Sequence, residues 1–123
     1  MDADTLARLI DPDAWRAREE DQHTMGAQWQ LYERRCESAK AAERILDSGY
    51  AVVKLPDMVV DQSDTPTWPV PDISRWTEVF IRHSDRRIAM DAMATPLDRP
   101  EHALAVGAAL IAAAQYVLAV RDA

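Results

Sequence analysis

Residues 76–93 read WTEVFIRHSDRRIAMDAM, and this stretch gives the strongest indication of a β-sheet. Apolar and polar residues alternate on both sides of a turn at residues 84–85, which predicts an antiparallel β-hairpin. If Ile81 lies opposite Ile88, alternate residues of both strands make one coherent apolar face. A shift of one residue would bring Asp91 into that face, so we predict the first register.

The opposite face of the hairpin carries a candidate site for binding another protein. The register places Glu78 opposite Asp91 and Arg82 opposite Arg87, and like-charged pairs are unfavourable unless a counter-ion bridges them. We expect Lys54, on a neighbouring strand, to be the counter-ion of the acidic pair. Aromatic and arginine side chains are enriched in interaction hot spots. The candidate protein-interaction residues are therefore Trp76, Phe80, Arg82, Arg86 and Arg87, with Trp68 from the preceding segment.

The residues before the hairpin predict a strand followed by a long loop. Residues 50–55, YAVVKL, alternate with period two and stop at Pro56, which is typical of a strand. We expect residues 56–74 to be an acidic, proline-rich loop, extended around its prolines. A loop of this length is uncommon in a compact domain and is often functional or mobile. Trp68 in this loop either covers the outer face of the hairpin or packs over its own core.

The N-terminal half, residues 1–48, is expected to be helical. Asp11 can cap a helix that has Pro12 at its first position, where the missing N–H costs nothing. Good helix formers continue to residue 46, and Gly49 is typical of a helix C-terminus. Two alternatives stay open, because Thr24 can start a second helix or one helix can continue past it.

Five residues of this half form a stripe with spacings of 4, 3, 4 and 3, the a/d pattern of a coiled coil. Such a stripe is either one face of a core helix or a contact with another copy of the chain. Cys36 lies on it, which predicts an inert core thiol rather than a nucleophile. A homo-oligomer formed through this stripe would use Met25, Trp29, Tyr32, Cys36 and Ala39.

The last segment, residues 98–121, predicts an alanine-rich helix over residues 99–120. Asp98, Pro100 and Glu101 fit a capping box with proline in the first turn. Residues 103–120 approach the length of a membrane span, but alanine drives insertion weakly and no Lys/Arg cluster orients the flanks. We therefore expect a buried helix at the centre of a soluble protein, with no membrane partner.

The composition excludes several classes of function. Fourteen Lys and Arg against twenty-one Asp and Glu give a net charge of −7, which disfavours direct nucleic-acid binding. One cysteine and three glycines cannot supply a disulfide framework, a multi-Cys zinc site or a phosphate loop. The three histidines lack metal-binding spacing, and the adjacent residues His83, Ser84 and Asp85 cannot form a catalytic relay. We expect no cofactor, no metal and no enzymatic activity.

Two stretches of the N-terminal half support a resemblance. Residues 10–15, IDPDAW, and residues 42–50, AERILDSGY, together with Ser38, resemble small uncharacterised proteins of actinobacterial phages. The alanine-rich C-terminal helix is similar to the tails of such proteins. The resemblance implies a phage or prophage origin and expression in the cytoplasm of a bacterial host. It carries no activity and no functional residue with it.

These observations predict a single α+β domain over residues 1–123 and leave three functions open. The first is a non-enzymatic protein that binds a host or phage protein through the outer face of the hairpin. The alternative is a structural component of a virion or another oligomer, indicated by the a/d stripe and the alanine-rich helix. The third is an acidic nucleic-acid mimic, indicated by the acidic loop and the net charge.

Overall fold

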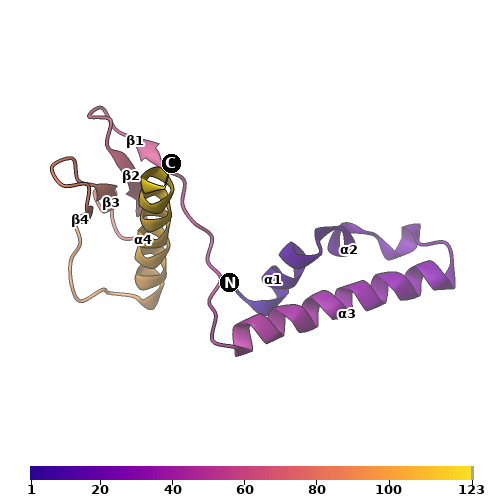
Figure 1. Ribbon diagram of the computed structural model, residues 1–123. Helices are drawn as coiled ribbons and strands as arrows, with labels where there is room; N and C mark the ends of the chain where they lie inside the picture. The colour runs from indigo at the N-terminus through magenta and orange to yellow at the C-terminus, as the bar shows by residue number, and fades with distance from the viewer. Residues whose placement is uncertain (123) are drawn as a thin grey trace. The chain divides into compact units, whose positions relative to one another are not determined.

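The computed structural model describes residues 1–122 and has two compact units, residues 1–52 and the segment from residue 53 onward. Helices combine with a four-stranded antiparallel sheet, so the predicted α+β class is confirmed (Figure 1). The single domain over residues 1–123 stays a prediction, and each compact unit has a hydrophobic cluster of its own. Each unit is therefore described by itself.

Capping residues divide the first unit into three helices. Asp11 Oδ1 accepts a hydrogen bond from the backbone N–H of Ala14 at 3.4 Å, and Thr24 Oγ1 accepts one from Ala27 at 3.0 Å. Thr24 therefore starts a separate helix, which decides between the two alternatives. Gly49, with a φ of 88°, follows the last helix as predicted. The elements are α1 (Ala3–Ile10), α2 (Pro12–Arg16), a single 3-10 turn (Glu19–Asp21) and α3 (Met25–Asp47).

Helices α1 and α2 pack along one face of α3 (Figure 1). Leu31, Ser38 and Ala42 are the buried residues of α3, and Arg35 lies half-buried among them. The indole N–H of Trp15 donates a hydrogen bond to Ser38 Oγ at 3.0 Å. This hydrogen bond supplements the apolar cluster of Leu6, Ala7 and Ala42.

The predicted a/d stripe is not the buried face of α3. Met25, Trp29 and Tyr32 are 87%, 60% and 59% exposed, while Cys36 and Ala39 are half-buried. The core interpretation is wrong for the first three residues, because α1 and α2 pack on an adjacent face of the helix, where Leu31, Ser38 and Ala42 are buried. The alternative, contact with another copy, stays a prediction.

The second unit pairs four strands in the order β1-β2-β3-β4. The predicted register of the last two is confirmed, since Val79 pairs with Met90 and Ile81 pairs with Ile88. Val79 and Ile81 are buried in the core, whereas their partners on the edge strand are partly exposed. The paired strands are shorter than predicted. Their bounds are β1 (Val59–Val60), β2 (Pro66–Pro69), β3 (Glu78–Ile81) and β4 (Ile88–Asp91).

A hairpin of β1 and β2 lies where the sequence predicts a loop over residues 56–74. Asp61 Oδ1 accepts hydrogen bonds from the backbone N–H groups of Ser63 at 2.8 Å and Thr65 at 3.0 Å, which builds the turn. Judged from the sequence, the prolines at both ends of β2 argue against a strand in the middle of a sheet, because proline cannot donate to a ladder. Pro66 pairs only with β1 and Pro69 only with β3, so neither ladder requires the missing N–H.

Residues 50–55 have irregular backbone, although the sequence predicts a strand there. The backbone N–H of Val70 donates to the carbonyl of Thr77 at 2.9 Å, on the side of β3. Because backbone groups alternate in direction along an extended chain, those of residues 69 and 71 point away from β3. Both residues are prolines and have no N–H to offer. The segment that precedes β1 therefore finds no complete partner for a ladder.

Helix α4 (Pro100–Arg121) packs on one face of the sheet (Figure 1). Ala109 and Ala113 are fully buried in the cluster that also contains Trp68. The capping-box prediction is wrong, because Arg99 occupies the N-cap and makes no side-chain cap. By length and composition alone, α4 is apolar enough to cross a membrane. It is not buried all round, since one side exposes Leu104, Ile111 and Leu118.

Candidate functional site

The face of the sheet opposite α4 carries the outer face of the predicted hairpin. Val59, Thr67, Phe80 and Ala89 are successive cross-strand partners, so they share one face and form a row across all four strands. Trp68 alternates with this row and lies in the core beside α4. Within residues 53–122, α4 is the one helix and covers the other face. We call the face that carries the row the open sheet face.

The basic end of the open sheet face lies at the tip of the hairpin. The backbone N–H of Arg82 donates to the carbonyl of Arg87 at 2.8 Å, which places these residues opposite each other as predicted. Asp85 pairs with Arg82 and lies 3.7 Å from Arg87 Nε, so its carboxylate bridges the two guanidinium groups. The hydrogen bond from Arg82 holds the pKa of Asp85 below its ordinary value. Arg86 is exposed beside them.

The acidic end of this face consists of Glu78 and Asp91, which are cross-strand partners as predicted. Lys54 was expected to neutralise them, and that prediction is wrong because its segment is not a strand of the sheet; Lys54 lines a pocket instead. Burial raises the pKa of Glu78, and the charges of Asp91 and Asp61 raise it further.

Replacing Glu78 with Gln should stabilise the second unit at neutral pH. A carboxyl whose pKa is raised by folding disfavours the folded state above that pKa, and the difference disappears once it is protonated. We expect Glu78→Gln to gain about 0.5 kcal/mol at neutral pH, the size of one like-charge cross-strand contact. Melting curves recorded across the acidic range should converge below about pH 4. A variant less stable than the wild type at neutral pH would contradict this account.

The structure separates the two tryptophans of the candidate site. Trp76 is 67% exposed in the turn before β3, and the Arg75 guanidinium lies 4.6 Å from its ring centre. Trp68 is 3% exposed, and its ring packs edge-on against that of Tyr116 at 5.7 Å. Trp68 is therefore a core residue, and it does not cover the outer face of the hairpin.

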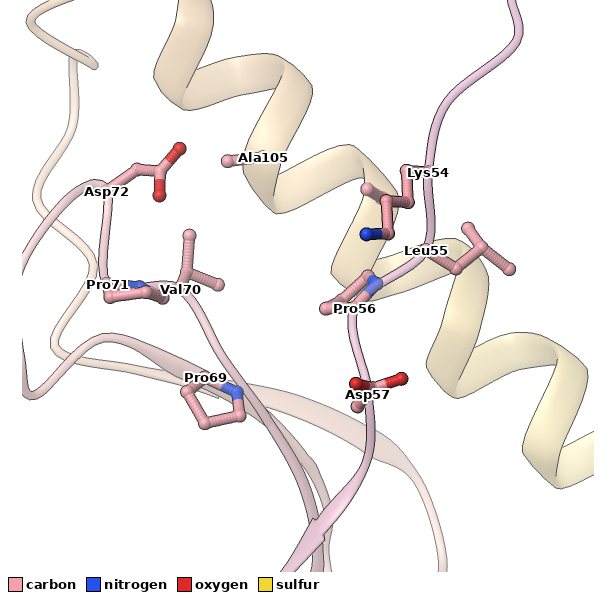
Figure 2. Close-up of a pocket in the computed structure, with 10 residues that line it drawn as sticks. Lys54, Leu55, Pro56, Asp57, Pro69, Val70, Pro71, Asp72 and Ala105 are labelled. Carbon is pink, nitrogen blue, oxygen red and sulfur yellow. The ribbon is translucent and has the colours of Figure 1, made fainter. Parts of the chain in front are cut away.

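A pocket of about 350 Å³ lies at the end of the β1–β2 pairing (Figure 2). Residues 54–57 form one wall, residues 69–72 form the other, and Ala105 and Ala108 of α4 contribute small side chains. The pocket exists because the prolines at positions 69 and 71 prevent the two walls from pairing. The described lining residues offer charges of both signs and apolar contact, without a His, Cys, Ser or Thr nucleophile. In the sequence, the feature that indicates this pocket is the pair of alternate prolines at positions 69 and 71.

The other side chains that could bind a metal ion or act as a nucleophile do not form a cluster. Within residues 1–122, no group of three His, Cys, Asp or Glu side chains is placed to hold a metal ion. His83 Nε2 lies 2.9 Å from the carbonyl oxygen of Ser63. Cys36 is half-buried rather than fully buried, and a hydrogen bond with it raises the pKa of Tyr32.

Comparison with protein-family models, with curated proteins and with solved structures finds no match for this chain. No family is therefore assigned. The open sheet face and the exposed residues of α3 are the two surfaces that indicate a function.

Proposed function

We propose that the protein is a non-enzymatic binding protein whose second unit contacts a protein partner through the open sheet face. The observation that supports this best is the arrangement of that face. The row that contains Phe80, which is apolar except for the buried Thr67, lies between a basic end, Arg82 and Arg87, and an acidic end, Glu78 and Asp91. Such a surface is complementary to a protein segment that carries an apolar centre and the opposite order of charges.

The charges of this face favour a protein over a nucleic acid. A phosphate backbone would gain from the arginines but would be repelled by Glu78 and Asp91. A protein surface can match both ends at once, and charge pairs at the rim then fix its orientation. The resemblance to phage proteins makes a host or phage protein the partner that we propose.

A double variant, Trp76→Ser with Arg87→Glu, tests this proposal. Both side chains are exposed, so we expect the free energy of unfolding to change by only about 0.5 kcal/mol. An aromatic hot spot contributes about 2 kcal/mol or more at an interface, equivalent to roughly 30-fold in affinity. The measurement is quantitative affinity purification from an actinobacterial lysate with tagged wild type and variant.

The control is Leu104→Ser, which replaces another exposed side chain of the same unit on α4. This variant should retain the same proteins as the wild type. If the double variant also retains them, the open sheet face is not the binding surface. Phe80 is left unchanged because it is half-buried, and its replacement would confuse binding with folding.

A second candidate function, a component of an assembly, is favoured by a separate observation. Met25, Trp29 and Tyr32 project from α3 as an exposed apolar stripe. Contiguous apolar surface of this kind marks interaction sites on soluble proteins.

A further inference from the structure

We infer that β4 pairs in antiparallel orientation with β4 of a second copy of this chain, so that the two sheets join edge to edge. Strand β4 is the last of the order β1-β2-β3-β4, so one of its sides has no neighbouring strand (Figure 1). The inference goes beyond the proposed function, because it concerns the edge of the sheet rather than the open sheet face. Two residues, Arg87 and Asp91, belong to both.

The backbone of β4 presents unpaired hydrogen-bonding groups at this edge. The N–H of Arg82 donates to the carbonyl of Arg87, so Arg87 directs its backbone toward β3. Because backbone groups alternate along a strand, Ala89 also faces β3, whereas Ile88 and Met90 direct their N–H and C=O groups outward. In the part of the chain that the structure describes, neither of these two residues has a backbone hydrogen bond to a segment outside the β3–β4 pair. Such an edge is a template for an added strand.

The outward backbone groups select one register. Ile88 of one copy lies opposite Met90 of the other, and Ala89 lies opposite itself on a two-fold axis. Both outward residues then exchange hydrogen bonds with their partner, and the pairing covers the whole strand. Either shift that keeps the outward groups matched would pair one of them with Arg86 or Ala92, whose positive φ angles of 61° and 55° are not those of a strand. The contact is isologous, so it closes as a dimer.

The charges of β4 and its flanking arginine complement themselves in this register. Arg87 of each copy lies opposite Asp91 of the other, at both ends of the contact. These are non-hydrogen-bonded positions, where the side chains of an antiparallel pair approach most closely. Opposite charges at directly opposed positions stabilise the pairing of two strands. In a parallel pair in register, Arg87 would lie beside Arg87 and Asp91 beside Asp91, so the charges favour the antiparallel order.

The same contacts neutralise the like-charged pairs within each chain. Glu78 lies opposite Asp91, and burial and the charge of Asp91 raise the pKa of Glu78. None of the ion pairs of residues 1–122 includes either carboxylate. The Arg87 side chain is 79% exposed and lies 3.7 Å from Asp85, so its guanidinium has N–H donors left for a second carboxylate. The second copy supplies a cation to the acidic pair and a carboxylate to the arginines.

The apolar side chains of β4 also gain a partner. Ile88 and Met90 are 39% and 50% exposed at the edge, although their cross-strand partners on β3 are buried. In the dimer, Ile88 of one copy lies beside Met90 of the other, on the face that α4 covers. Strand addition draws its affinity from main-chain hydrogen bonds and its specificity from alternate side chains. The pairing therefore does not depend on a large apolar area.

Two charge variants, Arg87→Glu and Asp91→Arg, test the inference. Each variant alone places like charges opposite each other at both ends of the contact. We expect each to dimerise at least about tenfold more weakly than the wild type, because two contacts change from attraction to repulsion. An equimolar mixture of the two variants restores opposite charges at both ends, so it should form a mixed dimer as strongly as the wild type. Sedimentation equilibrium at low ionic strength measures all four samples.

The fold of both variants should be retained. Arg87→Glu puts a carboxylate opposite Arg82 of its own chain. Asp91→Arg puts a guanidinium opposite Glu78. Both variants thus replace a like-charged pair with an oppositely charged one, so their melting temperatures should not fall below that of the wild type. The matched control is Arg86→Glu, which makes the same change of charge at an exposed residue outside the strand and should dimerise like the wild type.

Amide hydrogen exchange reports the backbone pairing directly. The N–H groups of Ile88 and Met90 should become protected as the protein concentration rises, because they are bonded only in the dimer. The N–H of Ala89 faces β3 and should be protected at every concentration. Equal behaviour of the three amides would contradict the pairing of the outward edge.

A wild type that stays monomeric at all concentrations, or a mixture that associates no better than its components, would overturn the inference. Particles larger than a dimer would overturn closure by a two-fold axis. Trp76→Ser alone separates the inference from the proposed function, because Trp76 lies outside β4. A monomer that retains a different protein through Trp76 would leave only the proposed function standing. A dimer that retains no other protein would leave only the β4 pairing.

Discussion

Replacing Ala109 with Asp is expected to unfold the second unit. Ala109 is 0% exposed and lies in the cluster between α4 and the inner face of the sheet. An unpaired carboxylate there must be buried or protonated, at a cost of several kcal/mol against a total stability of about 5–15 kcal/mol. We expect loss of near-ultraviolet circular dichroism and of the cooperative thermal transition of this unit.

The control for this variant is Ile111→Asp, two residues further along the same helix. Ile111 is 45% exposed, so a carboxylate at this position stays in contact with water. We expect its effect to remain within about 1 kcal/mol. If Ala109→Asp melts at the wild-type temperature, α4 is not the core helix of this unit.

The hairpin of β3 and β4 shows what local alternation can predict. Its register follows from residues a few positions apart, and placing Ile81 opposite Ile88 is enough to fix the remaining pairs. The same register also predicts the two like-charged pairs of the open sheet face. It does not predict Asp85 as the bridge between the arginines, because that contact depends on the shape of the turn.

Strand β2 and the pocket were not predicted, because both depend on contacts between residues distant in sequence, which hydrophobic periodicity does not report. The strand β2 begins and ends with proline, and only the neighbouring ladders show that neither proline needs an N–H. The pocket depends on residues 54–57 lying beside residues 69–72 and α4, which no local pattern encodes. Its position follows from the prolines only after the direction of the β2–β3 hydrogen bonds is known.

The face on which α3 packs was missed for a chemical reason. Apolar periodicity selects Met25, Trp29 and Tyr32, the largest apolar side chains of the helix. The face that packs instead buries Leu31 and Ala42 together with Ser38, and the hydrogen bonds of Ser38 and the half-buried Arg35 hold α2 and the residues after it. A buried polar contact of this kind has no hydrophobic signature in the sequence.

Replacing Arg35 with Ala is therefore expected to destabilise the first unit by about 2 kcal/mol. The Arg35 side chain donates hydrogen bonds to the backbone carbonyls of Ala14 at 2.9 Å and Ala17 at 2.7 Å, and it lies 5.6 Å from the ring centre of Trp15. Its removal leaves two part-buried carbonyls without these donors. Denaturant titration followed by helical circular dichroism measures the loss.

Arg34→Ala is the matched control, because it removes the neighbouring arginine from the same helix. Arg34 pairs with Asp11, and its side chain is 49% exposed, so this ion pair is screened by water. We expect Arg34→Ala to cost much less stability than Arg35→Ala, since exposed pairs contribute little. Equal losses for the two variants would mean that the carbonyls of Ala14 and Ala17 do not depend on Arg35. The polar contact would then not be what holds α2 on α3.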